Sequence, residues 1–517
     1  MTAPNRRCDP LLLSSGLHAV ALRFPSKPAL LFGQITRTYA ELATRVRRVC
    51  GLARSLGLRK GDRVAVFAPN CAEYLELVAG LADAGLIVAT LNARSTAHEL
   101  AAACDDCEAR VLFVHSQLAG AAHEARFKTV ERIIILGEEY EGLLRDAPEC
   151  SPVPDIEETD PFALVYSSGT TGKPKGILIS HRSRVLTFHA MAMEYGCYGP
   201  DDYQLGIAPM AHGAGFAFIM ASVFFGGTVK ILPSFDPMEV VATLASEPFT
   251  SVFMVPTHFH AIFAAEKSQL DRYRGKATTL KSIISNASAL PQTTKEKIVA
   301  YWGEGLLHET YGSTEAGIVT NLRPRFQLIK RQSVGPAFAL NCIRLLDDDG
   351  REVGPGEVGE LFSRSPYVFN GYWNQPEETA KALRDGWVTA GDLARRDEDG
   401  FHYIVDRKKD MVVTGGFNVY PREVEEVLHR HPALLEAAVV GTPDEYFGEA
   451  LCAFLVVRQG MHVSADELQQ HCREMLSGYK VPKHYRFVAS LPKNAGGKVL
   501  KTALSKSFIE ETSRAAK

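Results

Sequence analysis

Short apolar runs alternate with helical patterns through the first 160 residues of the chain. Four of these runs are apolar or β-branched almost throughout, at residues 63–68, 86–90, 110–114 and 132–136. An amphipathic stretch, Glu73 to Ala84, precedes the second run. Apolar strands separated by helices are typical of βαβ units, whose parallel sheets are covered on both faces. The pattern therefore predicts an α/β protein with two parallel-type sheets, and similar runs continue at residues 229–232, 251–255 and 282–284.

The residue composition and the length of the apolar runs change after residue 330. Gly, Asp and Pro become frequent and the apolar runs shorten, which favours a small antiparallel, barrel-like β region. A charged segment, Asp406 to Asp410, then precedes an α+β unit in which Pro421 opens a helix and Ser464 to Glu467 forms a capping box. We therefore expect a large N-terminal domain over residues 1–406 and a smaller C-terminal domain over residues 407–517.

Composition excludes several classes of protein. The 57 Lys and Arg residues nearly balance the 60 Asp and Glu residues, whereas nucleic-acid binders usually carry a clear basic excess. No stretch reaches the roughly 20 apolar residues of a membrane helix. The ten cysteines are scattered, and the pair Cys104 and Cys107 lacks the second pair that a zinc site would need. We expect a cytoplasmic protein with no nucleic-acid partner and no transmembrane segment; its oligomeric state is left open.

The segment from Tyr166 to Gly176 carries the strongest chemical signal. Its eleven residues include three Gly, two Thr, two Ser and two Lys, and an apolar strand stands on each side of it. Such a hairpin offers backbone N–H groups, hydroxyls and ammonium groups to a phosphate chain, although a flexible surface loop would have the same composition. The candidate phosphate-binding residues are Ser167, Ser168, Gly169, Thr170, Thr171, Gly172, Lys173 and Lys175.

Four further residues suit nucleotide chemistry. Tyr311 offers an aromatic face, Glu315 is a hard oxygen ligand for Mg²⁺, Asp392 could accept hydrogen bonds from ribose hydroxyls, and Lys498 is a long cation in a Gly-rich loop. Taken singly, each also has an ordinary structural explanation as a core tyrosine, a solvated glutamate, a turn aspartate or a surface lysine.

Together these segments resemble the signatures of the adenylate-forming superfamily, which includes acyl-CoA synthetases, luciferases and peptide-synthetase adenylation domains. The resemblance spans essentially the whole chain. Its motifs, in order, are Ser167–Gly176, Pro209–Gly213, Tyr311–Glu315, Gly371–Trp373, Pro376–Thr379, Trp387–Asp392, Asp406–Asp410 and Pro492–Lys498.

This resemblance implies an enzyme that uses ATP, Mg²⁺ and coenzyme A. A carboxylate and MgATP would give an acyl-adenylate and pyrophosphate, and a thiol would then displace AMP. The catalytic residues implied are Lys498, His212, Thr170 and Glu315, and Glu315 would also bind the metal ion. Lys409 would be the hinge of the small domain, and Gly415 and Gly416 would line the CoA tunnel. Besides the phosphate loop, the ATP or AMP contacts implied are Ala287, Ser288, Tyr311, Gly312, Ser313, Thr314, Asp392 and Arg407.

The acyl pocket implied by the resemblance is formed by His212, Phe216, Asn286, Ala316 and Gly317. The stretches that contain these residues hold no Arg or Lys to pair with a second carboxylate, which favours an aryl or a short- to medium-chain monocarboxylate. Asn286 replaces a glycine found in many relatives. It could hydrogen-bond a polar substituent of the substrate, or it could satisfy a backbone group.

Three other functions share these motifs. A stand-alone adenylation enzyme could load an acyl or amino acid onto a carrier protein, although the segment Pro209 to Gly215 lacks the acidic residue that usually holds a substrate amine. A luciferase-like oxygenase and a non-enzymatic nucleotide sensor are the remaining alternatives. We expect the CoA nucleotide to lie near Lys480 and Lys483 on the small domain.

Overall fold

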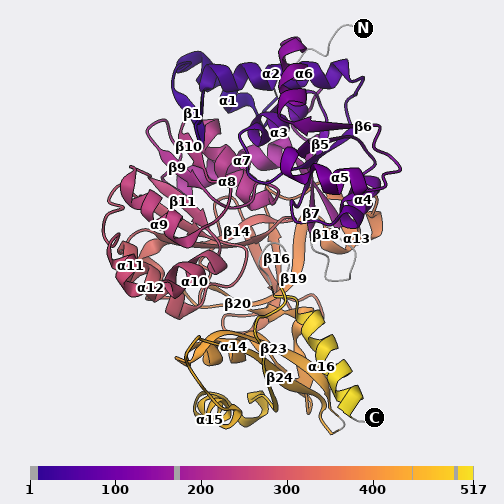
Figure 1. Ribbon diagram of the computed structural model, residues 1–517. Coiled ribbons are helices and arrows are strands. Elements are labelled where there is room, and N and C mark those ends of the chain that lie inside the picture. The colour runs from indigo at the N-terminus through magenta and orange to yellow at the C-terminus, as the bar shows by residue number, and fades with distance from the viewer. Residues whose placement is uncertain (1–9, 168–174, 445, 494–498, 516–517) are drawn as a thin grey trace.

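The computed structural model describes residues 10–167, 175–444, 446–493 and 499–515 (Figure 1). Its first sheet has parallel pairing in the middle, as the apolar runs predict, and antiparallel pairing where β7 meets β8. The strands follow the order β17 (Gly371–Tyr372), β8 (Lys175–Ser180), β7 (Pro161–Ser167), β4 (Ile87–Leu91), β3 (Arg63–Phe67), β5 (Ala109–His115) and β6 (Arg132–Leu136).

A second sheet also has a parallel centre, from β1 to β13, and antiparallel pairing at both edges. Its order is β14 (Gly317–Leu322), β13 (Leu307–Ser313), β12 (Ser282–Ser285), β11 (Ser251–Met254), β9 (Tyr203–Gly206), β10 (Thr228–Ile231), β1 (Pro28–Phe32) and β2 (Ile35–Thr38). The prediction of two parallel-type sheets is therefore confirmed.

The segment after residue 330 forms a separate antiparallel sheet, as its short apolar runs predict. The strands are β15 (Cys342–Leu346), β16 (Val358–Arg364), β19 (Trp387–Arg396), β18 (Leu383–Arg384) and β20 (His402–Arg407). Strand β20 leads into the short 3₁₀ turn Lys408–Asp410 and then into the small C-terminal unit.

Helices surround the two large sheets, and the largest apolar core joins side chains of α2, α3, α7 and α8 to strands of both sheets. The helices of this part are α1 (Ser15–Arg23), α2 (Tyr39–Ser55), α3 (Glu73–Asp83), α4 (Ala97–Asp106), α5 (Ala119–Glu124), α6 (Glu138–Asp146), α7 (His181–Tyr195), α8 (Gly213–Phe225), α9 (Pro237–Ser246), α10 (Pro256–Ala264), α11 (Lys267–Asp271), α12 (Gln292–Trp302) and α13 (Pro376–Ala382).

The small C-terminal unit lies beyond β20, at the bottom of Figure 1. Pro421 begins its first helix, and the capping box forms as predicted, since Ser464 Oγ accepts from Glu467 N at 3.2 Å and the Glu467 carboxylate accepts from Ser464 N at 2.7 Å. Its elements are β21 (Val412–Thr414), β22 (Phe417–Val419), α14 (Pro421–His429), β23 (Leu434–Asp444), β24 (Gly448–Val457), α15 (Ala465–Met475), β25 (His484–Phe487) and α16 (Lys501–Ala515).

Within the described ranges, no helix combines the length and the apolar character that crossing a membrane would require.

Candidate active site

The predicted phosphate loop connects β7 to β8, the antiparallel hairpin expected from its flanking apolar runs. Ser167 ends β7 and Lys175 begins β8. The other predicted phosphate contacts lie outside the described residues; they are Ser168, Gly169, Thr170, Thr171, Gly172 and Lys173. The Lys175 ammonium group lies 2.6 Å from Glu378 Oε2 and 4.9 Å from the centre of the Tyr372 ring. Lys175 is thus held at the base of the loop by residues of the Gly371–Thr379 motif.

The Tyr311–Glu315 motif forms the turn between β13 and β14. A Cβ atom on Gly312 would lie 2.0 Å from the carbonyl oxygen of Gly317, so only glycine lets the two backbones approach here. Ser313 Oγ accepts a hydrogen bond from Ala316 N at 3.1 Å and fixes the turn that carries Thr314 and Glu315.

Tyr311, Asp392 and Arg407 contact one another although they come from three strands in two sheets. The Tyr311 hydroxyl donates to Asp392 Oδ2 at 2.6 Å, and Arg407 Nε lies 3.2 Å from Asp392 Oδ1. Burial and the Asp392 carboxylate raise the pKa of Tyr311 far above its ordinary value, so the hydroxyl stays protonated as a donor. The network orients a carboxylate, a guanidinium and an aromatic ring at one place.

Glu315 is half-buried in the turn that follows β13, the strand that carries Tyr311. Its Oε1 accepts a hydrogen bond from the Tyr372 hydroxyl at 2.8 Å. The described residues contain no group of three His, Cys, Asp or Glu side chains that could enclose a metal ion. Glu315 fits Mg²⁺ nonetheless, because this ion takes one or two carboxylates and completes its shell with phosphate oxygens and water.

The predicted contacts at Ala287 and Ser288 lie in an exposed turn after β12. Ala287 has φ of +82°, a conformation that suits glycine better than alanine. The Asn286 side chain supports this turn, since its Oδ1 accepts from Ala287 N and its Nδ2 donates to Thr310 Oγ1 at 2.8 Å. Of the two roles expected for Asn286, the structure shows the one in which it satisfies a backbone group.

His212 precedes the first residue of α8. Its Nε2 is buried and has no hydrogen-bond partner in the described part of the chain. Burial and the positive charge of Arg94 lower the pKa of His212, so the ring is neutral at pH 7. A neutral, unpartnered imidazole at the start of α8 is available to a ligand.

Several residues predicted to form the acyl pocket are aromatic or small. Phe216 is buried on α8, and Phe218 stacks on Phe253 with ring centres 4.1 Å apart. Ala316 is buried, and a Cβ atom on Gly317 would lie 2.8 Å from Tyr367 Cβ. Glycine at position 317 therefore allows Tyr367 to pack closely here, and a larger side chain would collide with it.

Arg184 also reaches this region, and sequence reasoning missed it because it belongs to α7. Its Nη2 lies 3.7 Å from the position that a Cβ atom on Gly213 would take, and Thr314 Cγ2 lies 4.0 Å from the same position. Its buried Nε has no partner, and no ion pair or hydrogen bond to Arg184 exists among the described residues. Burial lowers its pKa to about 10, so it remains a cation. The stretches predicted to form the pocket lack a cation, but the folded pocket region has one.

The small domain presents the remaining predicted residues. Lys409 lies in the turn after β20, and burial lowers its pKa. Gly415 and Gly416 join β21 to β22 with positive φ, and both are exposed. Gly415 N donates to the carbonyl oxygen of Phe447. Lys498 lies outside the described residues.

Aromatic and basic side chains gather near this glycine turn. Phe417 stacks on Tyr479 with ring centres 4.8 Å apart, and the Lys483 ammonium group lies 3.5 Å from the centre of the Phe447 ring. Both predicted cations carry acidic partners, because Lys480 pairs with Glu423 at 2.8 Å and Lys483 pairs with Asp444 at 3.0 Å.

Comparison with known proteins is consistent with this geometry. The long-chain-fatty-acid–CoA ligase of Bacillus subtilis (strain 168) is 34% identical, over 97% of this chain and 94% of its own. A feruloyl-CoA synthase of an Amycolatopsis species is also 34% identical, over 94% and 96% of the two chains. The solved o-succinylbenzoate CoA synthetase of Bacillus subtilis, in complex with its acyl-adenylate intermediate, superposes with a TM-score of 0.85 at 28% identity, covering 96% of this chain and 98% of that one.

Two family models together match most of the sequence. The model of the AMP-binding enzyme matches residues 17–373, and the model of the AMP-binding enzyme C-terminal domain matches residues 423–498. From these matches and the fold of the described residues, we conclude that the chain belongs to the AMP-binding enzyme family, within the adenylate-forming superfamily.

Proposed function

We propose that this protein is an AMP-forming acyl-CoA synthetase. The observation that carries the proposal is the contact of Tyr311, Asp392 and Arg407 beside Glu315, which fits an adenosine nucleotide with its Mg²⁺. In the first half-reaction, a substrate carboxylate oxygen attacks the α-phosphorus of ATP. The bond from that phosphorus to the bridging oxygen breaks, and pyrophosphate leaves with the electron pair.

The described residues bind and orient the nucleotide for this step. Asp392 accepts hydrogen bonds from the ribose hydroxyls while the Tyr311 hydroxyl and Arg407 hold its carboxylate in place. Glu315, steadied by Tyr372, binds Mg²⁺, which neutralises phosphate charge when it is bound. Lys498 and Thr170 are proposed from the motif resemblance to stabilise the charge that develops on the transferred group.

In the second half-reaction, the CoA thiolate attacks the acyl carbonyl carbon and AMP leaves. We propose that the C-terminal domain, residues 407–517, turns about Lys409 between the two halves, relative to residues 1–406. Gly415 and Gly416 would then line the tunnel of the CoA arm, because a backbone without side chains can approach a ligand closely. The aromatic and basic side chains Phe447, Tyr479 and Lys483 support a CoA nucleotide site beside that turn.

The proposed acid is an aryl or a short- to medium-chain monocarboxylate. Phe216 and the stacked pair Phe218 and Phe253 supply aromatic surface, and Ala316 and Gly317 add small apolar residues. His212, neutral at pH 7, would lie between the acid and the CoA tunnel and could gate the tunnel or contact the carboxylate.

A second substrate class is favoured by Arg184. A buried guanidinium without a carboxylate partner is costly, and an anionic group of a substrate would offset that cost. An acid with a second negative group is therefore the alternative to a monocarboxylate. The similarity to an o-succinylbenzoate CoA synthetase is consistent with this class.

The experiment that tests the proposal is pyrophosphate release with a panel of acids, with and without CoA. The panel runs from acetate to palmitate and includes benzoates, cinnamates, dicarboxylates and amino acids. Acid-dependent pyrophosphate release, with AMP release that requires CoA, is the expected result. Adenylate that CoA never discharges would instead identify an enzyme that loads a carrier protein.

A further inference from the structure

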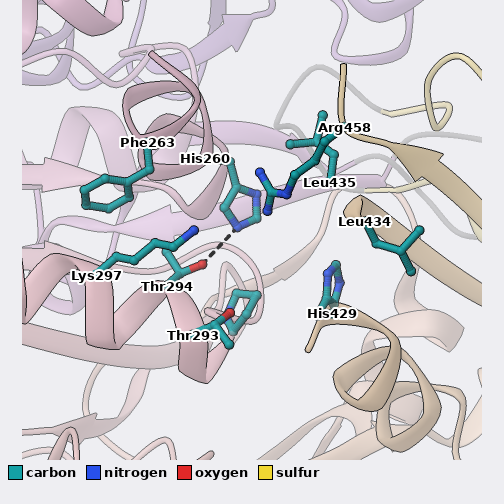
Figure 2. Close-up of a pocket in the computed structure, with 10 residues that line it drawn as sticks. His260, Phe263, Thr293, Thr294, Lys297, His429, Leu434, Leu435 and Arg458 are labelled. Atoms are coloured by element: carbon teal, nitrogen blue, oxygen red, sulfur yellow. Dashed lines mark hydrogen bonds between the residues drawn. The ribbon is translucent and has the colours of Figure 1, made fainter. Parts of the chain in front are cut away.

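A cavity of about 30 Å³ lies where the small domain meets α10 and α12 of the large domain (Figure 2). The large domain contributes His260, Phe263, Pro291, Thr293, Thr294 and Lys297, and the small domain contributes His429, Leu434, Leu435 and Arg458. The volume exceeds the roughly 10–15 Å³ that one water molecule requires. The cavity therefore has room for a small ion, but not for a nucleotide.

Four of the lining side chains are basic, two from each domain. Figure 2 shows His260, Lys297 and Arg458 directed toward the same space, with His429 on the small-domain side. Burial lowers the pKa of His260 to about 4, and the charges of His429, Lys493, Lys297 and Arg458 act in the same direction. The charge of Arg458 likewise contributes to lowering the pKa of Lys297. The four basic groups are thus close enough to repel one another when charged.

No carboxylate in the described part of the chain forms an ion pair with any of these four groups. The nearby acids are engaged elsewhere, since Glu436 pairs with Lys493 and Glu425 pairs with Lys501. Among the described residues, the Arg458 guanidinium donates to the carbonyl oxygen of Pro432 alone, at 3.1 Å. His260 meets Thr294 Oγ1 at 3.3 Å. The carboxylates of Glu425, Glu426 and Glu436 act on His429 from the small domain, whereas Lys297 and Arg458 pair with no carboxylate that the structure describes.

The arrangement suits an oxyanion better than a neutral molecule. A guanidinium offers a planar fork of donors that matches phosphate oxygens, and an ammonium group adds a point charge. The first turn of α12, which carries Thr293 and Thr294, adds the positive end of the helix dipole. An anion between the domains would replace repulsion across the interface with attraction to both sides.

We propose that this interdomain cavity binds one tetrahedral oxyanion of the inorganic phosphate type, and that the bound anion stabilises the domain arrangement seen here. Because the bound anion would hold the two domains in this one arrangement, it opposes the domain movement proposed between the two half-reactions. This coupling rests on the proposed function, whereas the binding itself does not. The site would recognise phosphate oxygens, which both inorganic phosphate and the pyrophosphate product carry.

Calorimetric titration of the full chain with inorganic phosphate, in a chloride buffer of constant ionic strength, tests the site. We expect one phosphate per chain. Lys297→Gln and Arg458→Gln should each weaken binding about tenfold or more, because each removes a charge-assisted hydrogen bond. Lys267→Gln on α11, an exposed lysine away from the cavity, is the matched control and should bind as the parent protein does. A parallel titration with pyrophosphate distinguishes the two sources of the anion.

Two results would overturn the site. One is the absence of phosphate binding to the parent protein. The other is binding that both variants retain and that a non-hydrolysable ATP analogue abolishes, since that phosphate would occupy the nucleotide site. Circular dichroism and ATP affinity of the variants confirm that each remains folded.

The coupling has its own test, which starts from preformed acyl-adenylate on the enzyme. Phosphate at ten times its dissociation constant should slow thioester formation by up to about tenfold, because binding to one arrangement stabilises it by that factor. At the same phosphate concentration the Arg458→Gln variant, which binds at least about tenfold more weakly, should be slowed by no more than about twofold. Equal slowing in both proteins would overturn the coupling. Failure of every acid to form an adenylate would contradict the proposed function and leave the titration result standing.

Discussion

Arg407 Nε, at the end of β20, lies 3.2 Å from Asp392 Oδ1 on the neighbouring strand β19. The pair stands directly before the Lys408–Asp410 turn that leads into the small domain. A nucleotide held by Asp392 is therefore held next to the proposed hinge.

Replacing Asp392 tests the nucleotide site. Asp392→Asn removes the charge that Tyr311 and Arg407 orient, and we expect the KM for ATP to rise about 10- to 100-fold, because hydrogen bonds to charged groups contribute roughly 1.5–3 kcal/mol. Steady-state kinetics with varied ATP measures this change. Asp397→Asn, at an aspartate that pairs with Lys330, is the control and should leave the KM unchanged. An unaltered KM in Asp392→Asn would contradict the role given to Asp392.

The backbone conformation of Ala287 should affect the stability of the protein. Alanine at φ of +82° is strained by about 1 kcal/mol, and glycine at this position would remove that strain. We expect Ala287→Gly to unfold at equal or higher urea concentration than the parent protein. Asn286→Ala should unfold at lower concentration, since Ala287 N and Thr310 Oγ1 both lose a partner. A clear loss of stability in Ala287→Gly would show that strain is not the governing factor.

Arg184 decides between the two substrate classes. If it binds a second negative group of the acid, Arg184→Met should lower kcat/KM for that acid about tenfold or more and leave the matching monocarboxylate nearly unaffected. Paired kinetics with a dicarboxylate and its monocarboxylate analogue measure the difference. A rise in the KM for ATP with no change in acid preference would place a phosphate oxygen at Arg184 instead.

His181 predicts how stability depends on pH. The buried ring accepts a hydrogen bond from Leu13 N on Nδ1, and burial lowers its pKa from 6.5 to about 4, against the opposing charges of Asp83 and Asp160. As the pH falls, His181 is protonated in the unfolded chain before it is protonated in the folded one. The contribution of the neutral ring to the free energy of unfolding is therefore complete above pH 6.5 and is lost as the pH falls through 4. It amounts to at most about 3 kcal/mol.

Urea unfolding between pH 7 and pH 4 measures this effect. The parent protein should lose stability across that window, and His181→Gln should lose less of it, because its side chain cannot be protonated there. His98→Gln, at an exposed histidine, should follow the parent profile. Identical profiles for the parent and His181→Gln would contradict the assignment.

Local patterns predicted much of the fold because their causes are local. The β7–β8 hairpin follows from two apolar runs around a Gly-rich loop, and the start of α15 follows from Ser464 and Glu467 alone. Contacts between distant segments were not predictable in the same way. Arg184 reaches Gly213 only because α7 packs on α8, and the Asn286 amide finds Thr310 only because β12 pairs with β13. The cavity between the domains depends on how the two domains meet, which no local pattern specifies.

The most direct test of the central claim is the stoichiometry of nucleotide products. The protein is incubated with ATP, Mg²⁺, CoA and the preferred acid, and AMP, ADP, pyrophosphate and thioester are quantified together. We expect AMP, pyrophosphate and acyl-CoA in equal amounts, each dependent on the acid, and no ADP. ADP and phosphate as the products, or AMP formed without any acid, would contradict adenylate formation as the chemistry of this site.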